Sequence, residues 1–297
     1  MVDAAVSNYK LINKIKDDTF NVDLISNYNL SLQINPDLFR ICVTDSVKNR
    51  CLLLEDYSLN SSLDSDKILG QLQEIFEEHH ILKAGFWKSV KLGFKTFNFV
   101  LVPNSLFDKE YGKDYLNLNG TIKSESCEEV QFYHQHSGDL VNIFSADKNL
   151  IEWFRLAYPA KPIKIFHHTS SFIEGLFLNR NHKEDKSMFL YVESNLITIV
   201  IAKSKSLEFC NSFAFTTPDD FIYYVMFVID QLKFNVELNT VTVWGDLLPD
   251  SPMYKKLFKY IRNVSFGTKP GSIYFGYNFD EIFDHNYFDL YSMHLCE

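Results

Sequence analysis

Two short motifs contain the residues whose types and spacing could support chemistry. His134 and His136 are two residues apart, so on a strand both imidazoles would point to one face, as a metal pair requires. No third ligand can be named, so a solvated strand face is favoured and no metal site is predicted. The run Gly267–Gly271 lacks the Gly-x-x-x-x-Gly-Lys-Ser/Thr order of a phosphate loop, and an ordinary loop is predicted there.

The composition points away from phosphate-binding surfaces. The chain has 297 residues, with 29 basic and 38 acidic side chains, for a net charge of −9. Nucleic-acid binding normally needs clustered Lys and Arg, so no nucleic-acid partner is expected. There are 11 glycines, whereas average usage of about 7% would give about 20, so few sites let the backbone close around a phosphate. Hydrophobic residues make up 46% and aromatic residues 15%, ample for a buried core.

The sequence predicts a reduced, cytoplasmic protein. The N-terminus has no basic and apolar segments of a secretory signal. The longest apolar run, Phe221–Ile229, is nine residues long, whereas a bilayer span needs about 20, so no membrane span is expected. The cysteines are odd in number and widely spaced, which fits neither a disulfide framework nor a zinc ribbon: they are Cys42, Cys51, Cys127, Cys210 and Cys296.

Two stretches of the chain repeat one order of elements, which predicts a duplicated α/β (mixed α+β) fold. In the first stretch, strands are predicted over 28–34, 38–44, 51–57 and 98–102, with a helix over 64–80 before the last of them. In the second, strands are predicted over 188–192, 196–202, 207–215, 240–244 and 264–266, with helices from 217 and over 253–261. The second stretch has a strong helix-start signal, because Thr217 can cap the helix and Pro218 suits its first turn.

A shift of 158 residues aligns Ser31–Tyr57 with Phe189–Phe215 without a gap. Ile34 then falls on Val192 and Tyr57 on Phe215, although only four of the 27 pairs are identical. The shared order of elements therefore carries the prediction of a tandem duplication.

The segment between the repeats is predicted to hold a hairpin, with strands over 130–137 and 140–145, followed by a helix over 150–158 and a strand over 163–167. Ser171 and Glu174 have the spacing of a capping box that would open the next helix. The adjacent histidines His167 and His168 are expected at a polar loop edge.

This order of elements resembles the actin-like ATPase fold, in which two ribonuclease-H-like subdomains flank a cleft. More narrowly, the chain is similar to a bacterial family of unknown function with that fold, and the ending, Asn286–Tyr291 and Leu295–Glu297, carries most of this similarity. The resemblance predicts a lead-in over 1–22, a first subdomain with the inserted hairpin over 23–182, a second subdomain over 183–275, and an aromatic tail over 276–297.

The resemblance places any activity in the turns after the first strand of each subdomain, where actin-like ATPases have Asp-x-Gly. Here the turns are Asn35–Asp37 and Glu193–Asn195, and neither contains a glycine. The glycine pair that holds adenosine in the family is reduced to Gly245, followed by Asp246. The resulting cofactor-binding candidates are Asn35, Asp37, Glu193, Asn195, Gly245 and Asp246, and no catalytic residue is predicted. A ribonuclease-H-like nuclease needs a carboxylate in the first strand, whereas Gln33 and Tyr191 stand there.

Two functions remain open. The favoured one is a non-catalytic, degenerate ATPase that acts as a scaffold, binding an unidentified protein partner or a second copy of itself, with no cofactor. The alternative is a divergent ATP-binding enzyme, an ATPase or a small-molecule kinase using Mg-ATP in the cleft. Tyr287, Phe288 and Tyr291 in the tail are predicted to form an exposed, partner-binding patch.

Overall fold

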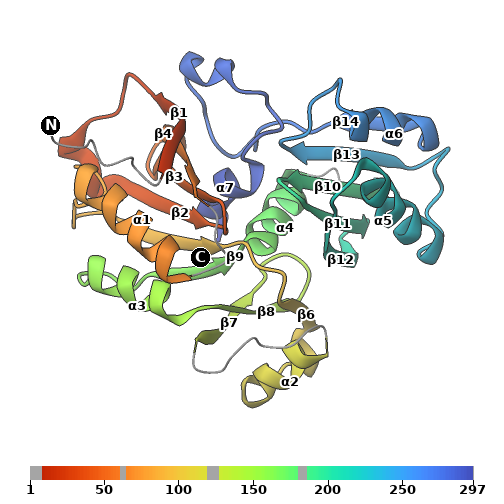
Figure 1. The fold of residues 1–297 in the computed structure, drawn as a ribbon, viewed down its shortest axis with the longest axis horizontal. Coiled ribbons are helices and arrows are strands. Elements are labelled where there is room, and N and C mark those ends of the chain that lie inside the picture. Colours follow the sequence, from red (N-terminus) through yellow and green to blue (C-terminus); the bar gives the residue numbers. More distant parts are fainter. Residues whose placement is uncertain (1–8, 61–64, 119–126, 180–185, 297) are drawn as a thin grey trace, which may run out of the picture.

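A computed structural model describes residues 9–60, 65–118, 127–179 and 186–296 as two lobes, each built on a central sheet (Figure 1). The first sheet runs, in spatial order, β1 (Tyr9–Lys16), β4 (Arg50–Leu59), β3 (Leu38–Asp45), β2 (Tyr28–Ile34), β5 (Ser89–Phe94) and β9 (Lys164–His167). The second sheet runs β12 (Ser206–Ala214), β11 (Leu196–Lys203), β10 (Ser187–Glu193), β13 (Thr240–Gly245) and β14 (Asn263–Phe266). A third sheet runs β6 (Phe99–Pro103), β8 (Leu140–Asp147) and β7 (Glu128–His134).

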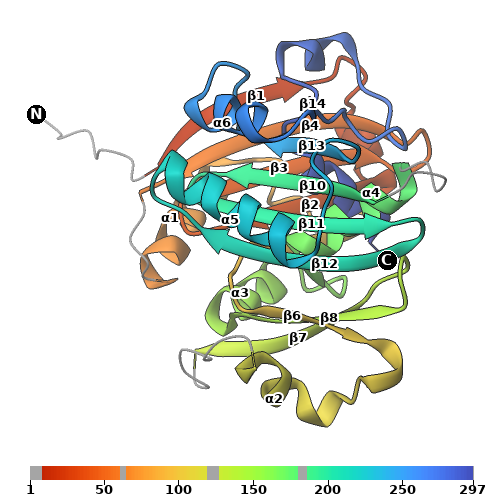
Figure 2. The same ribbon diagram turned by 90° about the vertical axis from the view of Figure 1, so that its right-hand side faces the viewer.

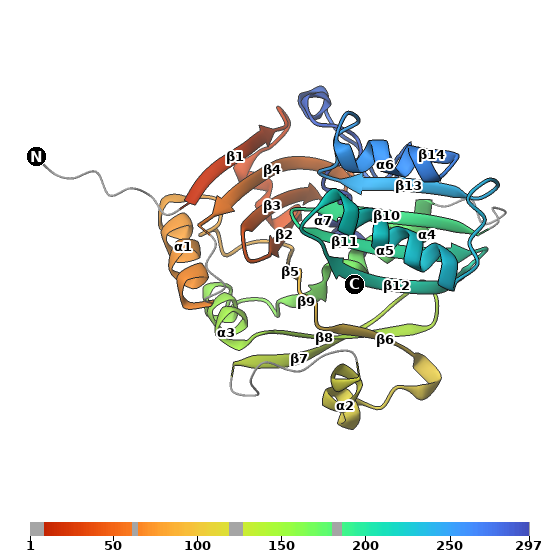
Figure 3. The same cartoon turned by 45° about the vertical axis from the view of Figure 1, so that its right-hand side comes forward.

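Most of the described helices lie against the first two sheets, and the short helix at 112–117 packs on the third (Figures 1 and 3). They are α1 (Ser65–Glu78), α2 (Gly112–Asn117), α3 (Lys148–Ala157), α4 (His168–Asn179), α5 (Pro218–Gln231), α6 (Pro252–Tyr260) and α7 (Phe288–Ser292). Helices α1 and α3 cover the outer face of the first sheet, and α5 and α6 cover the outer face of the second. Helices α7 and α4 contact each other and lie between the two sheets, α7 against the first and α4 against the second.

The predicted duplication is confirmed by the strand order and by the pairing register. Without β1, the first sheet has the same order and directions as the second. Ile34 pairs with Phe39, and their equivalents 158 residues later, Val192 and Ile197, pair with each other. Both lobes therefore fold the same first hairpin in the same register.

The gapless alignment is wrong for the third strand. Tyr57 pairs with Phe39, whereas the equivalent of Phe39, Ile197, pairs with Phe213 and not with Phe215. The cause is the turn between the second and third strands, which is two residues shorter in the second lobe because β12 starts directly after Ser204 and Lys205.

Two predictions for the first lobe are also wrong. Its fourth strand is β5, and the strand predicted over 98–102 belongs to the third sheet as β6. Lys91 and Gly93 obscure the apolar pattern of β5, yet Lys91 Nζ is buried and donates to the carbonyls of Met293 and His294 at 3.0 and 2.9 Å. The loose lead-in predicted for 1–22 contains β1, which pairs with β4.

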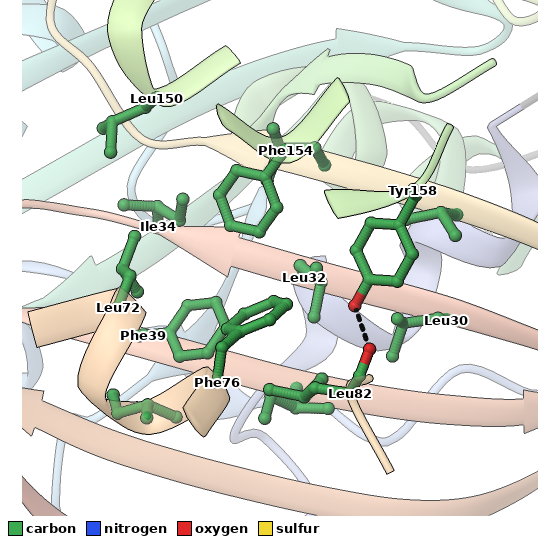
Figure 4. Packing of buried hydrophobic residues seen from close by; sticks show 14 of the residues in the cluster. Leu30, Leu32, Ile34, Phe39, Leu72, Phe76, Leu82, Leu150, Phe154 and Tyr158 are labelled. Atoms are coloured by element: carbon green, nitrogen blue, oxygen red, sulfur yellow. Dashed lines mark hydrogen bonds between the residues drawn. The ribbon is translucent and has the colours of Figure 1, made fainter. Parts of the chain in front are cut away.

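A shared core holds α1 and α3 on the first sheet (Figure 4). The stripe of α1 residues Ile68, Leu72, Ile75 and Phe76 is buried, as helical spacing requires. The Phe76 ring meets Phe154 of α3 edge-on at 5.7 Å. Tyr158 donates from its hydroxyl to the carbonyl of Leu82 at 2.8 Å, so its polar end is satisfied inside the core.

The capping box predicted at Ser171 and Glu174 is wrong, because α4 starts three residues earlier, at His168. Ser171 donates back to the carbonyl of His168 at 3.0 Å. The Glu174 carboxylate instead accepts from the amide of His136 at 2.6 Å and from the Ser137 hydroxyl at 2.9 Å. It therefore holds the turn of the predicted hairpin, now β7 and β8, against α4.

The aromatic tail is buried, which overturns the predicted exposed patch. Tyr287, Phe288 and Tyr291 are at most 4% exposed. Phe288 packs on Trp244 of the second lobe, with ring centroids 5.0 Å apart, and Tyr291 packs in the cluster on the first sheet. The tail joins the lobes because its apolar side chains fill the space between α4 and the first sheet.

Within the described residues, no helix has the length and apolar character needed to cross a membrane.

Candidate functional site

The two turns that correspond to the phosphate-binding turns of the fold are hydrogen-bonded to each other. Asn35 Nδ2 donates to Glu193 Oε2 at 3.1 Å, and Ser194 Oγ donates to Asp37 Oδ2 at 2.9 Å. Asn35 and Glu193 are equivalent under the 158-residue shift, so the contact joins the same position of the two lobes. Asn195 is exposed, and its carbonyl accepts from the amide of Phe215. The side chains of these two turns therefore fill the space directly between them.

Six charged residues surround this contact, and we call them the interlobe cluster: Arg40, Asp56, Lys95, Glu193, Asp246 and Asp289. Glu193 is 2% exposed and forms ion pairs with Arg40 through Oε1 and with Lys95 through Oε2. Arg40 also reaches Asp56 at 3.2 Å and Asp246 at 3.8 Å. The second lobe therefore contributes Glu193 and Asp246, and the first lobe supplies both cations.

Asp289 from α7 completes the cluster and binds equivalent positions of both lobes. Its carboxylate accepts from Gln33 Nε2 at 2.8 Å and from the Tyr191 hydroxyl at 2.5 Å. Gln33 and Tyr191 are related by the 158-residue shift. Lys95 Nζ lies 3.1 Å from the same carboxylate, so the fully buried Asp289 has both oxygens occupied. The tail thus connects the two lobes through polar contacts as well as apolar ones.

The electrostatics of the cluster keep its innermost groups charged. Burial alone would raise the pKa of Glu193, but Arg40 and Lys95 outweigh it and lower this pKa to about 2. Burial opposes the charge on Lys95, yet Asp289 and Glu193 raise its pKa above the ordinary value. Desolvation, helped by Glu193, outweighs Arg40 and raises the pKa of Asp246, although 44% of this side chain is exposed. Two cations face four carboxylates, so the cluster carries excess negative charge where a nucleotide would place its own.

The backbone conformation at position 245 requires glycine. Its φ is +97°, and a Cβ there would lie 1.9 Å from the carbonyl oxygen of Val192. Its amide donates to the carbonyl of His285, and the next amide, that of Asp246, donates to Val192. The backbone amides of Gly245 and Asp246 are therefore both hydrogen-bonded within the protein.

Comparison with known proteins identifies the family. The family described as "Protein of unknown function (DUF3822)" matches residues 17–264. The chain belongs to this family. No curated protein matches it in sequence.

Solved structures show which fold the family has. A Bacteroides thetaiotaomicron protein of unknown function with an actin-like ATPase fold is 22% identical, and the match covers 94% of this chain and 99% of that one with a TM-score of 0.80. A chain of the PilM–PilN type IV pilus biogenesis complex is 10% identical over 90% and 97% of the two chains, with a TM-score of 0.56. The ethanolamine utilization protein EutJ from Carboxydothermus hydrogenoformans is 7% identical over 95% and 93%, with a TM-score of 0.51. The predicted actin-like fold and family of unknown function are confirmed.

The residues of the two other motifs considered for chemistry make packing or hydrogen-bond contacts within the protein. His134 Nδ1 lies 3.1 Å from Asn104 Oδ1, and no group of three possible metal ligands occurs among the described residues. In the run from Gly267 to Gly271, a Cβ on Gly267 would lie 1.8 Å from the Trp244 ring, so glycine is needed there for packing. Lys269 of the same run donates to the carbonyl of Phe279 at 2.8 Å.

Sequence reasoning missed four members of the interlobe cluster: Arg40, Asp56, Lys95 and Asp289. One signal was present, because Arg40 stands in the middle of the otherwise apolar strand Leu38–Val43. A charge inside a buried strand requires a partner, although the sequence does not say which. Lys95 and Asp289 gave no comparable signal, since each lies in a segment of mixed polarity.

His167 and His168 are buried and not at a polar loop edge as predicted. They are at most 1% exposed where β9 meets α4. His167 Nε2 bonds to the carbonyl of Thr96 at 3.0 Å, and His168 Nε2 bonds to Thr198 Oγ1 of the second lobe at 3.1 Å. Burial lowers the pKa of His167 to about 3 and that of His168 well below its ordinary value. The native protein therefore keeps both rings neutral in mild acid.

Because both histidines are buried as neutral rings, we expect the free energy of unfolding to decrease as the pH is lowered below about 6.5. The unfolded chain protonates both histidines near pH 6.5, whereas the folded chain does not until near pH 3 for His167. Unfolding therefore takes up protons in this window, and each histidine removes about 1.4 kcal/mol of stability per pH unit. His285 and His294, whose pKa values are also lowered by burial, act in the same direction.

Urea unfolding at pH 7, 6 and 5 measures this slope. Glu193 does not contribute here, because its lowered pKa adds stability that is lost only between about pH 4.5 and 2. His168→Gln should flatten the slope, and His134→Gln, at an exposed position, should leave it unchanged. Equal slopes in all three proteins would contradict the assignment.

Proposed function

We propose that this protein is a non-catalytic member of the actin-like fold and that it works as a scaffold for protein interactions in the cytoplasm. One observation carries the proposal: the turns that would hold phosphates bond to each other through Asn35 and Glu193, and the interlobe cluster surrounds them. Phosphate cradles are built from backbone amides near glycines, and neither turn has a glycine. The excess of carboxylates would repel a triphosphate.

An interaction role agrees with two further features. The net charge of −9 disfavours nucleic acid as a partner, which leaves proteins as the partners we propose. One structural neighbour, in the PilM–PilN complex, is a protein that assembles with another protein. The proposed partner is a protein, including a second copy of this chain, and no cofactor is required.

A divergent ATP-binding enzyme is the second candidate. It is favoured by a cavity of about 210 Å³ beside the first turn, lined in part by Asn35, Pro36, Lys95 and Thr96. This volume is below the roughly 300–1,000 Å³ typical of ligand pockets, and the residues that line the cavity all belong to the first lobe. A nucleotide bound between the two lobes would require the lobes to open. Opening would separate Glu193 from Arg40 and Lys95, which the ion pairs oppose.

Calorimetric titration with Mg-ATP and Mg-ADP tests the proposal. We expect no heat at millimolar nucleotide and no change in melting temperature, whereas a ligand at 100 times its Kd would stabilise the fold by about 2.7 kcal/mol. Binding at micromolar concentration would overturn the scaffold proposal. Hydrolysis that is lost in Glu193→Ala, with the variant shown to be folded, would establish the enzyme instead.

A further inference from the structure

A cavity of about 380 Å³ lies between two strands that each form the edge of a sheet (Figures 2 and 3). On one side is β6, the outer strand of the third sheet, and on the other is β12, the outer strand of the second sheet. Residues 99–101 of β6 and 207–211 of β12 line it, and none of its lining residues belongs to the interlobe cluster. Its volume falls within the roughly 300–1,000 Å³ typical of binding sites.

The backbone edges of both strands border this cavity. Successive side chains of a strand point to opposite faces, so a cavity against one face of a sheet would be lined by every second residue. Here the lining residues are consecutive, over 99–101 and over 207–211, which places the strand edges at the cavity. Among the described residues, β12 pairs only with β11 and β6 only with β8, and no other backbone hydrogen bond is made by 207–211 or 100–102. Alternate amides and carbonyls of each edge are therefore available to another strand.

One side of the cavity is apolar. Leu101 from β6 and Leu207 and Cys210 from β12 pack against the same buried cluster, which includes Phe172 of α4. Asn211 also lines the cavity, and it points to the opposite face of β12 because it directly follows Cys210. An extended segment in this cavity would therefore place every second side chain on an apolar surface and the intervening side chains on a more polar one.

The edge of β12 is regular beyond a bulge. Phe209 pairs with Ile201 whereas Leu207 pairs with Ala202, so Glu208 is the extra residue of the bulge. From Phe209 to Ala214 the pairing with β11 is continuous. These six residues give an edge about 20 Å long at about 3.4 Å per residue, and the cavity borders its first half. A segment of four to six residues is long enough to pair with it.

We propose that β12 takes up one extended segment of a partner protein as an added strand in this cavity, an inference that deepens the proposed scaffold function and rests on it. The amides and carbonyls along a strand edge carry alternating partial charges, which another extended backbone matches. The opposite wall, β6, stands in the way of a whole sheet from a second copy, whereas a single strand can enter. The segment should have apolar residues at alternate positions, facing Leu101, Leu207 and Cys210.

Selection of random heptapeptides displayed on phage against the full chain, followed by fluorescence anisotropy with the synthetic peptides, tests the inference. We expect peptides with alternating apolar residues and micromolar Kd values, because a flexible segment must be ordered on binding. Cys210→Phe, which places a ring in the cavity, should raise the Kd at least about tenfold. The matched control is Leu11→Phe at a 41% exposed position of β1, which is also an edge strand, and it should leave the Kd unchanged.

Two measurements on the wild-type chain test backbone pairing without relying on a variant. Alternate amides of an added strand face β12, so N-methylation of one alternating set in the peptide should raise the Kd at least about tenfold, and methylation of the other set should have a smaller effect. Hydrogen exchange of the complex should slow in residues 207–214 and stay unchanged in β1.

The outcomes separate this inference from the function on which it rests. The added strand is overturned if no selected peptide binds with a Kd below about 1 mM, if methylation of neither set weakens binding, or if Leu11→Phe weakens it as much as Cys210→Phe. A wild-type dimer, seen by analytical ultracentrifugation, that the peptide dissociates would make a second copy the occupant and overturn the partner segment. Nucleotide binding in the calorimetric titration would overturn the scaffold function whatever the peptides do.

Discussion

Replacing Lys95 with methionine should destabilise the fold by about 3–5 kcal/mol. The side chain is 3% exposed and pairs with both Glu193 and Asp289, so its removal leaves the buried Asp289 without a cation and Glu193 with Arg40 alone. Breaking a buried ion pair from one side costs this much because the remaining charge stays desolvated. Since most folded proteins are stable by only about 5–15 kcal/mol, the loss is a large share of the total. Urea unfolding followed by circular dichroism measures it.

A double-mutant cycle measures the interaction between Lys95 and Glu193 separately from the packing lost in each single variant. Glu193→Gln in the Lys95→Met background removes one of the two carboxylates that Lys95 pairs with, so the double variant should lose less stability than the sum of the single variants. Lys164→Met, at an exposed position on β9 of the same sheet, is the matched control and should change stability by less than about 0.5 kcal/mol. Additive losses in the cycle would show that Lys95 and Glu193 do not interact.

Truncating the chain after Asn286 should prevent folding altogether. The deletion removes Phe288, Leu290 and Tyr291, which are at most 1% exposed, together with Asp289. Removing one such aromatic side chain costs about 3–5 kcal/mol, so the sum exceeds an ordinary free energy of unfolding. The predicted result is a protein without a cooperative melting transition and with rapid proteolysis.

A point variant tests the same segment in a protein that still folds. Tyr291→Ala should lose about 3–5 kcal/mol, because the ring is fully buried in the cluster on the first sheet. Phe283→Ala, whose ring is 53% exposed in the same tail, should lose less than about 1 kcal/mol. A truncated chain that melts cooperatively at the wild-type temperature would show that the tail is dispensable.

The interlobe cluster gives a physical reason for the proposed loss of the nucleotide site. Arg40 and Lys95 supply the positive charge that phosphates would need, but Glu193 and Asp289 already neutralise it. The two cations at the centre of the molecule are therefore paired with carboxylates of the chain itself, one of which comes from the tail. Such a centre favours a fixed arrangement of the lobes, which agrees with the proposed scaffold function.

The sequence by itself determined the local structure and the duplication. Alternating apolar residues predict β2, the apolar stretch 188–192 predicts β10, and the helix start at Thr217 is confirmed as a capping box between Thr217 and Asp220. The first hairpin repeats after 158 residues in the same register. These features depend on residues close together in the chain, where spacing and turn chemistry are sufficient. The missing glycines in the two turns could also be read directly.

Only the tertiary structure decided what fills the centre of the molecule. Arg40 and Glu193 are 153 residues apart, and Gln33 and Asp289 are 256 apart, so no local pattern joins them. The tail shows the same limit, because its aromatic residues suit an exposed patch as well as a core until the facing surfaces are known. Burial and ion pairing are properties of the assembled lobes: a charge can be placed inside only where its distant partners also arrive.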